Sequence, residues 1–198
     1  MEGWTLIEAI AVVGNLAYTV LMMLNRRLGW LFGIAASALG CALFWHMQVY
    51  AQVGLNAFYV LMGAYGWWQW GQGRGGELPI TRRGPLFHLL ILLAGAMATL
   101  LLVHAARYWQ DAQHVELDAT VTAFSLLATW MLARRILENW AWWIVTDSGA
   151  IVLYLLLGLH FYAALYAVYV GLSIAALVRW KREWRASQAL QPAEERSP

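Results

Sequence analysis

The residue best suited to chemistry in this sequence is an aspartate inside an apolar segment. Asp147 lies seven positions after Trp140, about 10 Å along a helix, so its carboxylate is too deep to reach the end of the segment easily. Trp140, Trp143 and Tyr154 stand at helical spacings from Asp147 and share its face. An anion between aromatic rings suits a flat organic cation. The alternative is a protonated or hydroxyl-paired Asp147 beside tryptophans that anchor the segment at a membrane interface.

Two further segments carry polar and aromatic side chains at helical spacing. One contains Gln52, Asn56 and Tyr59 and ends at Trp70, and the other contains tyrosines and a serine. Amide, hydroxyl and ring groups on facing helices can line a polar pathway and hydrogen-bond a ligand. The alternative is that these groups hold membrane helices together. The second stripe consists of Tyr162, Tyr166, Tyr169 and Ser173.

Glu8 and Asp118 each open the first turn of an apolar segment. A carboxylate there favours the positive end of the helix dipole, so we expect capping, with a gate as the alternative. The five histidines are not spaced as metal ligands, and the chain has no Walker sequence. No nucleophile stands with a base. We therefore expect no metal, no cofactor and no enzyme activity.

The composition indicates the environment of the chain. Of its 198 residues, 62% are hydrophobic and 12% are charged, whereas soluble domains average about 25% charged residues. Thirteen tryptophans suit membrane interfaces or a flat ligand, because indole combines an apolar body with one polar group. The formal net charge of +2 excludes a nucleic-acid partner, and a single cysteine, Cys41, excludes a disulfide scaffold. We therefore expect an all-α membrane protein in contact with the lipid bilayer.

Seven apolar runs are long enough to cross a bilayer as helices, which takes about 20 predominantly apolar residues. The fifth run is the least apolar. We expect the first to remain in the mature protein, because Glu8 and Asn15 lie inside it and no basic region precedes it. The expected spans are Leu6 to Met23, Leu28 to Trp45, Val49 to Trp70, Leu86 to His104, Asp118 to Leu132, Trp140 to Leu157 and Phe161 to Val178.

The basic residues orient these spans. When the connections are assigned alternately to the two sides, twelve of the thirteen Lys and Arg residues fall on one side, and only Arg107 falls on the other. Lys and Arg are enriched in cytoplasmic connections. The sequence therefore predicts an outside amino terminus and a cytoplasmic carboxyl terminus.

An internal repeat appears at an offset of 110 residues. It pairs Glu8 with Asp118, Asn15 with Ser125, Trp30 with Trp140, Tyr59 with Tyr169, and Trp70 with Trp180. The offset superposes spans one to three on spans five to seven, and span four restores the orientation. This predicts a 3+1+3 arrangement of parallel repeats with a substrate site near the midplane. The predicted parts are residues 1–70 as first repeat, 71–117 as linker with helix four at about 86–104, 118–180 as second repeat and 181–198 as cytoplasmic tail.

Three segments resemble a known family. They are Gln52-Val-Gly-Leu-Asn56-Ala-Phe-Tyr59 leading into Tyr65-Gly-Trp67-Trp68-Gln-Trp70, Glu138-Asn-Trp140-Ala-Trp-Trp143-Ile-Val-Thr-Asp147, and Tyr162-Ala-Ala-Leu-Tyr166-Ala-Val-Tyr169. With the sequence from Asn15 to Trp180 they are similar to the PnuC family of bacterial vitamin-precursor transporters. Some members that take nicotinamide riboside have an amide at the position of Asp147, so the carboxylate is a departure.

The resemblance implies a SWEET-like fold of seven helices, a homotrimer in the bacterial inner membrane, and facilitated diffusion of nicotinamide riboside. Phosphorylation in the cytoplasm then traps the substrate. The implied substrate-binding residues are Trp140, Trp143, Asp147, Gln52, Asn56, Tyr59, Tyr162 and Tyr166. Further residues of a cavity or gate are Asn15, Tyr18, Ser37, Trp67, Trp70, Tyr154, Tyr169, Glu8 and Asp118.

Alternatives remain open at this point. Thiamine is also an aromatic cation and suits Asp147 equally, whereas neutral riboflavin would gain least from a carboxylate. A SWEET-like sugar carrier would need no anion there. A structural or sensory seven-helix protein would use the polar stripes only for packing.

Overall fold

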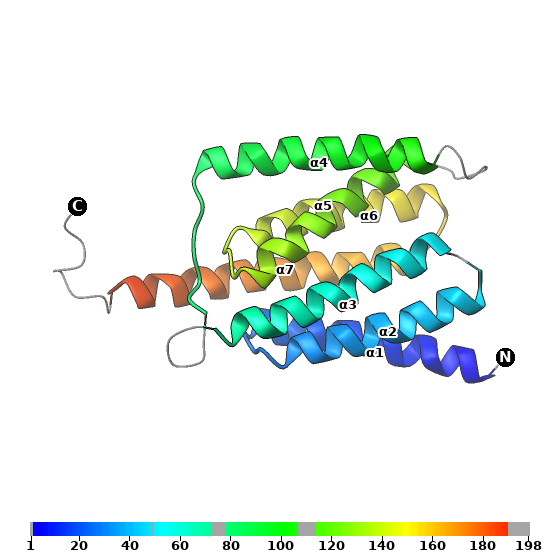
Figure 1. Ribbon diagram of the computed structural model, residues 1–198, viewed down its shortest axis with the longest axis horizontal. Coiled ribbons are helices and arrows are strands. Elements are labelled where there is room, and N and C mark those ends of the chain that lie inside the picture. The colour runs from blue at the N-terminus through cyan, green and yellow to red at the C-terminus, as the bar shows by residue number, and fades with distance from the viewer. Residues whose placement is uncertain (1, 49, 73–77, 107–113, 190–198) are drawn as a thin grey trace. The chain divides into compact units, whose positions relative to one another are not determined.

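The computed structural model is all-helical and describes residues 2–48, 50–72, 78–106 and 114–189, with side chains described from residue 10 onward except at positions 50 and 51. The side chain of Glu8, the basic residues Arg74, Arg107 and Arg196, and the tail after Ala189 lie outside the described residues. Figure 1 shows the helices α1 (Glu2–Met23), α2 (Gly29–His46), α3 (Tyr50–Trp70), α4 (Pro85–Ala106), α5 (Val115–Ala133), α6 (Asn139–Leu156) and α7 (His160–Ala189).

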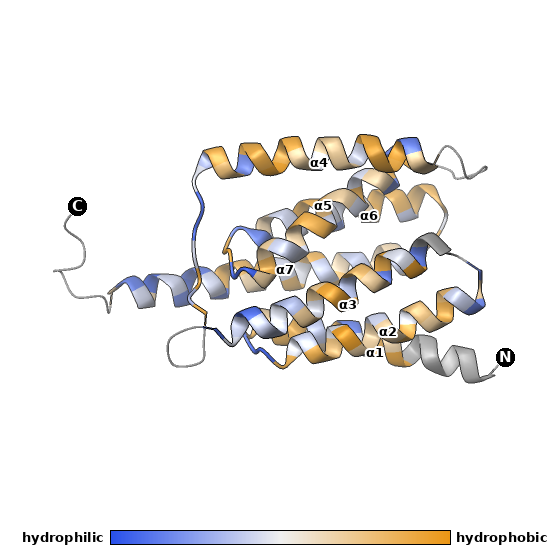
Figure 2. Cartoon of the chain, in the orientation of Figure 1, coloured by the Kyte–Doolittle hydropathy of each residue, from blue (hydrophilic) through white to orange (hydrophobic). Residues whose placement is uncertain are grey.

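The seven predicted spans coincide with these helices to within a few residues at most ends. In a bilayer only a helix satisfies the backbone groups of an apolar run internally, which is why the runs predict the helices. The largest difference is at α7, which continues beyond Val178 to Ala189 and becomes hydrophilic there (Figure 2). Among the described residues, four helices, α2, α4, α5 and α7, are long and apolar enough to cross a membrane. The prediction of an all-α fold is confirmed.

The first of two compact units contains Met1–Pro79 and Thr129–Arg135. Within it, α2 packs against both α1 and α3. A Cβ atom added to Gly66 of α3 would lie 2.4 Å from the ring of Trp30 on α2. Trp30 is buried and meets Trp70 edge to face, with ring centroids 5.7 Å apart. The core of this unit is therefore built from aromatic rings seated on small residues.

The second unit contains Ile80–Ala128 and Ile136–Pro198. Here α6 packs against α7, and Trp140 meets Trp180 edge to face with ring centroids 5.5 Å apart. A Cβ atom added to Gly95 of α4 would lie 2.3 Å from the ring of Phe124 on α5. The same Phe124 ring stacks on Trp142 of α6 at 5.4 Å. Most other large side chains of α4 are exposed, and Figure 2 shows this helix to be hydrophobic along most of its length.

Structural features recur at the offset of 110 residues predicted for the internal repeat. Asn25 and Arg135, for example, are separated by 110 residues. Both ends of α6 lie at this offset from the ends of α2, and α7 begins at this offset from the start of α3. The turns match too. Asn25 and Arg135 have φ of 59° and 52°, and Gln48 and Gly158 have φ of 61° and 72°. The pair α2–α3 and the pair α6–α7 are therefore built on the same plan.

Candidate functional site

Asp147 lies midway along the 18-residue helix α6, and only 4% of its surface is exposed. Among the described residues of the second unit, no basic side chain forms an ion pair with it. Its carboxylate is close enough to the phenol of Tyr169 on α7 for the two groups to interact electrostatically. A charge at the centre of a bilayer costs roughly 2.5 to 3.5 kcal/mol, so such residues usually have a function.

Four tyrosines lie between the carboxyl end of α6 and this carboxylate. Tyr154 of α6 stacks on Tyr162 of α7 at 5.2 Å and lies 5.2 Å from Tyr166, to which it is hydrogen-bonded. Tyr166 in turn meets Tyr169 edge to face at 5.6 Å. We call Tyr154, Tyr162, Tyr166 and Tyr169 the tyrosine ladder. It offers ring faces and hydroxyl groups along one line of approach to Asp147.

The two tryptophans predicted beside Asp147 differ in their surroundings. Trp140, in the first turn of α6, is buried against Trp180, and its indole N–H has no hydrogen-bond partner among the described residues. Trp143 is half-buried and one turn closer to Asp147. These contacts favour a packing role for Trp140 and leave Trp143 as the tryptophan better suited to a ligand. Asp118, at the start of α5, is exposed and interacts electrostatically with Tyr154.

In the first unit, Gln52 and Asn56 are half-buried on α3. The Asn56 side-chain amide donates a hydrogen bond to the backbone carbonyl of Gln52 at 2.9 Å. A Cβ atom added to Gly40 of α2 would lie 2.3 Å from the Asn56 side-chain oxygen, and Ser37 lies buried one turn earlier on α2. The structure therefore brings Asn56 against α2, in agreement with either a packing or a ligand-binding role.

Tyr18 and Tyr59 lie near each other in the same unit. They interact electrostatically, and Tyr18 also meets Trp30 edge to face at 5.8 Å. Asn15, predicted on the same helix as Tyr18, is exposed. Tyr18 and Tyr59 thus form a phenol pair in the first unit, while Asn15 takes no part in it.

Arginines cover the rings of Trp67 and Trp70. The Arg27 guanidinium lies 4.0 Å from the Trp67 ring centroid, and its Nε donates to the Trp67 backbone carbonyl at 2.7 Å. The Arg135 guanidinium lies 4.6 Å from the Trp70 ring centroid. Cation–π contacts of this kind hold the end of α3 in place. They favour a structural role for both tryptophans.

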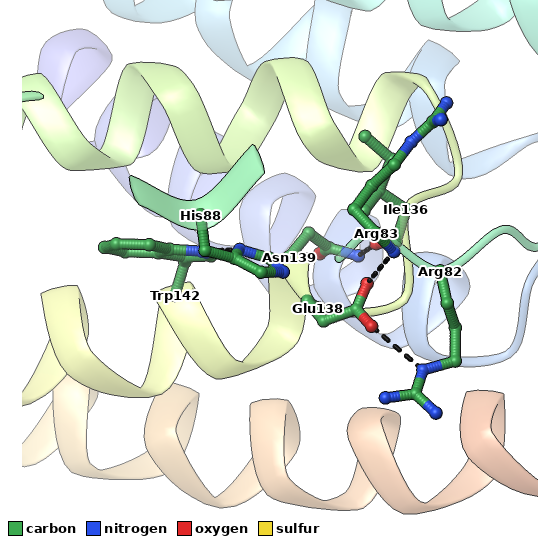
Figure 3. Close-up of polar contacts among 7 residues, drawn as sticks. All are labelled: Arg82, Arg83, His88, Ile136, Glu138, Asn139 and Trp142. Carbon is green, nitrogen blue, oxygen red and sulfur yellow. Dashed lines mark hydrogen bonds and ion pairs between the residues drawn. The ribbon is translucent and has the colours of Figure 1, made fainter. Parts of the chain in front are cut away.

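The sequence did not predict a polar cluster in the second unit (Figure 3). The Trp142 indole N–H donates to His88 Nδ1 at 3.2 Å, which joins α6 to α4. Glu138 accepts hydrogen bonds from Arg82 Nε at 3.0 Å and from the Arg83 backbone N–H at 3.3 Å. The available signal was His88 itself, a polar residue within an apolar run. Among the described residues, no three His, Cys, Asp or Glu side chains are grouped to hold a metal ion.

An all-helical protein with apolar helices long enough to cross a membrane, a buried carboxylate and a line of tyrosines has the features of a small-molecule carrier. The sequence model of the nicotinamide mononucleotide transporter family matches residues 5–182. The chain therefore belongs to this family of membrane transporters, which are not enzymes. The predicted relationship to PnuC proteins is confirmed.

Several known proteins are similar to this chain. The nicotinamide riboside transporter PnuC of Escherichia coli strain K12 is 21% identical over 93% of this chain and 89% of its own length. The riboflavin/roseoflavin transporter RibM of Streptomyces davaonensis is 24% identical over 94% of this chain and 90% of its own length. The crystal structure of the vitamin B3 transporter PnuC has a TM-score of 0.73 at 19% identity and covers 92% of this chain and 83% of that chain. The structural likeness establishes a shared fold.

Proposed function

We propose that this chain carries a flat, cationic vitamin precursor, with nicotinamide riboside as the foremost candidate, across the bacterial inner membrane by facilitated diffusion. Support comes from the family and from the similarity to the nicotinamide riboside transporter of E. coli over 93% of the chain. Phosphorylation of the substrate in the cytoplasm then keeps it inside the cell. Because trapping removes the transported species, this mechanism needs no coupled ion.

The single observation that best supports this substrate class is the buried carboxylate of Asp147 beside the tyrosine ladder. The pyridinium ring of nicotinamide riboside is flat and positively charged. Tyrosine faces attract such a ring, and a charge pair 4 Å apart is worth about 4 kcal/mol at an effective dielectric constant of 20. The phenol hydroxyls are suited to hydrogen bonds with the ribose.

We propose candidate substrate-binding residues within each unit, taken by itself. In the second unit these are Asp147, Trp143 and the tyrosine ladder. In the first unit they are Gln52, Asn56, Tyr59 and Tyr18, whose amide and phenol groups suit hydrogen bonds with a polar ligand. Trp140, Trp67 and Trp70 have packing roles in their own units.

The same proposal includes seven membrane spans in a 3+1+3 arrangement of parallel repeats, with the amino terminus outside, the carboxyl terminus in the cytoplasm and assembly as a homotrimer. Residues 1–70 and 118–180 are then the repeats. Support comes from the matching turns, at Asn25 and Arg135 and at Gln48 and Gly158.

Riboflavin is the second candidate, because RibM is similar to this chain over 94% of its length. Thiamine is the third, since it is an aromatic cation. A neutral isoalloxazine would draw little energy from Asp147, so the carboxylate favours the cationic substrates. A sugar carrier would leave the carboxylate without a role.

A binding experiment tests the charge recognition. Purified protein in detergent is titrated with nicotinamide riboside, with its neutral dihydro form, with thiamine, riboflavin and glucose. Asp147→Asn removes the charge with little change of shape. We expect the variant to bind nicotinamide riboside about tenfold to a hundredfold more weakly, the equivalent of about 1.4 to 2.8 kcal/mol.

The neutral dihydro form and the variant Glu116→Gln are the matched controls. Binding of the dihydro form should change little in Asp147→Asn. Glu116→Gln removes an exposed carboxylate in the first turn of α5 and should bind the cation normally. Equal weakening of the cationic and neutral forms would contradict recognition of the charge. Tight binding of riboflavin alone would replace the proposed substrate.

A further inference from the structure

His88, near the start of α4, lies between Trp142 and Asn139 of α6 (Figure 3). Its Nδ1 accepts the hydrogen bond from the Trp142 indole N–H. An imidazole nitrogen that accepts a hydrogen bond carries no proton, so the neutral ring has its hydrogen on Nε2. Nε2 is buried and has no hydrogen-bond partner among the described residues. The ring therefore presents one unused donor.

Asn139 presents the complementary group. Its side-chain Nδ2 donates to the Ile136 backbone carbonyl at 2.6 Å, which sets the orientation of the amide. Its Oδ1 is buried, and no donor reaches it in the part of the chain that the structure describes. In Figure 3 the Nε2 edge of His88 points toward Asn139. A buried donor and a buried acceptor without partners each carry a desolvation cost that mutual hydrogen bonding removes.

We propose that His88 is a positioning residue that joins α4 to the first turn of α6 by a relay from Trp142 through His88 to Asn139. The second contact passes through one water molecule, because neither Nε2 of His88 nor Oδ1 of Asn139 has a direct partner among the described residues. The relay holds the backbone on both sides of Trp140 and just before Trp143. Because one face of the Trp142 ring system is stacked on Phe124 of α5, His88 completes a connection between α4, α5 and α6.

Substituting His88 in two ways separates the two contacts. His88→Asn places an oxygen where Nδ1 accepts the Trp142 N–H. His88→Gln places an amide donor near the position of Nε2 and keeps the Asn139 contact. His88→Leu removes both. Each full-length variant is purified in detergent without substrate, and its melting temperature is measured under identical conditions.

We expect His88→Leu to melt about 2 to 4 °C below the unaltered protein, and His88→Asn and His88→Gln to lie between the two because each keeps one contact. The loss in His88→Leu should not add to that of Trp142→Phe. His160→Asn, which removes an exposed imidazole at the start of α7, should melt at the same temperature as the unaltered protein. His88→Asn and His88→Gln as unstable as His88→Leu, or additive losses in the double variant, would overturn the relay.

Discussion

Among single residues, Arg135 is the cation most constrained by its contacts. Its exposed fraction is 3%, its Nε donates to Asn25 Oδ1 at 3.0 Å, and its guanidinium also donates to the Leu78 backbone carbonyl and covers Trp70. A planar guanidinium can make these directional and stacked contacts together, whereas the lysine ammonium is a point charge. Position 135 therefore requires the shape and the several donors of a guanidinium in addition to its positive charge.

We predict that Arg135→Lys lowers the free energy of unfolding by about 1 to 3 kcal/mol, because buried acceptors lose their donors. Thermal unfolding in detergent measures this as a melting temperature lower by about 2 to 4 °C for each kcal/mol. The neighbouring Arg134 is exposed and provides the control, since Arg134→Lys should change stability by less than about 0.5 kcal/mol. Similar losses in both variants would mean that the contacts of Arg135 do not stabilise the fold.

Among the helices, the contact of α2 with α3 depends on the absence of a side chain at Gly66. A Cβ atom there would lie 2.4 Å from the rigid, buried ring of Trp30. Gly66→Ala should therefore force the two helices apart and cost about 1 to 3 kcal/mol of stability. Gly54→Ala, on the same helix, has no atom within 4 Å of the new Cβ and should be neutral or stabilising by up to about 1 kcal/mol. The difference in melting temperature between these two variants checks the packing.

The turns that precede α3 and α7 differ in one residue that matters. Gln48 and Gly158 both have positive φ, of 61° and 72°, which glycine adopts without strain and glutamine does not. We predict that Gln48→Gly raises the free energy of unfolding by about 0.5 to 1 kcal/mol and that Gly158→Gln lowers it by a similar amount. A higher melting temperature in Gln48→Gly and a lower one in Gly158→Gln would support the equivalence of the two turns. Shifts of the same sign in the two variants would contradict that equivalence.

For the whole molecule, the helices were predictable because their cause is local. Long apolar runs set them, and the ends at Met23 and Trp70 were predicted to the residue. The hydrophilic end of α7 was placed outside the span, yet the chain remains helical to Ala189. In this end of the helix, the Trp184 ring centroid lies 5.1 Å from the Arg82 guanidinium. Hydropathy reports membrane depth and not helix length, so it could not locate this end.

The candidate site was predictable only in part. The burial of Asp147 followed from its place in an apolar run, and the stripe of Tyr162, Tyr166 and Tyr169 followed from helical spacing. The contacts of Tyr154 with that stripe were not predicted. Trp67 and Trp70 are covered by Arg27 and Arg135, and each arginine lies far from its tryptophan in the sequence. Spacing along one helix carries no information about such partners. The link between His88 and Trp142 was missed for the same reason.

The most direct test of the central claim is counterflow in liposomes. Purified protein is reconstituted into vesicles loaded with unlabelled nicotinamide riboside, and entry of labelled nicotinamide riboside is followed without an ion gradient. We predict rapid, transient accumulation of label in vesicles with the unaltered protein, reduced about tenfold or more in Asp147→Asn. Entry no faster than into protein-free vesicles, in protein that binds nicotinamide riboside, would contradict passive transport of this substrate.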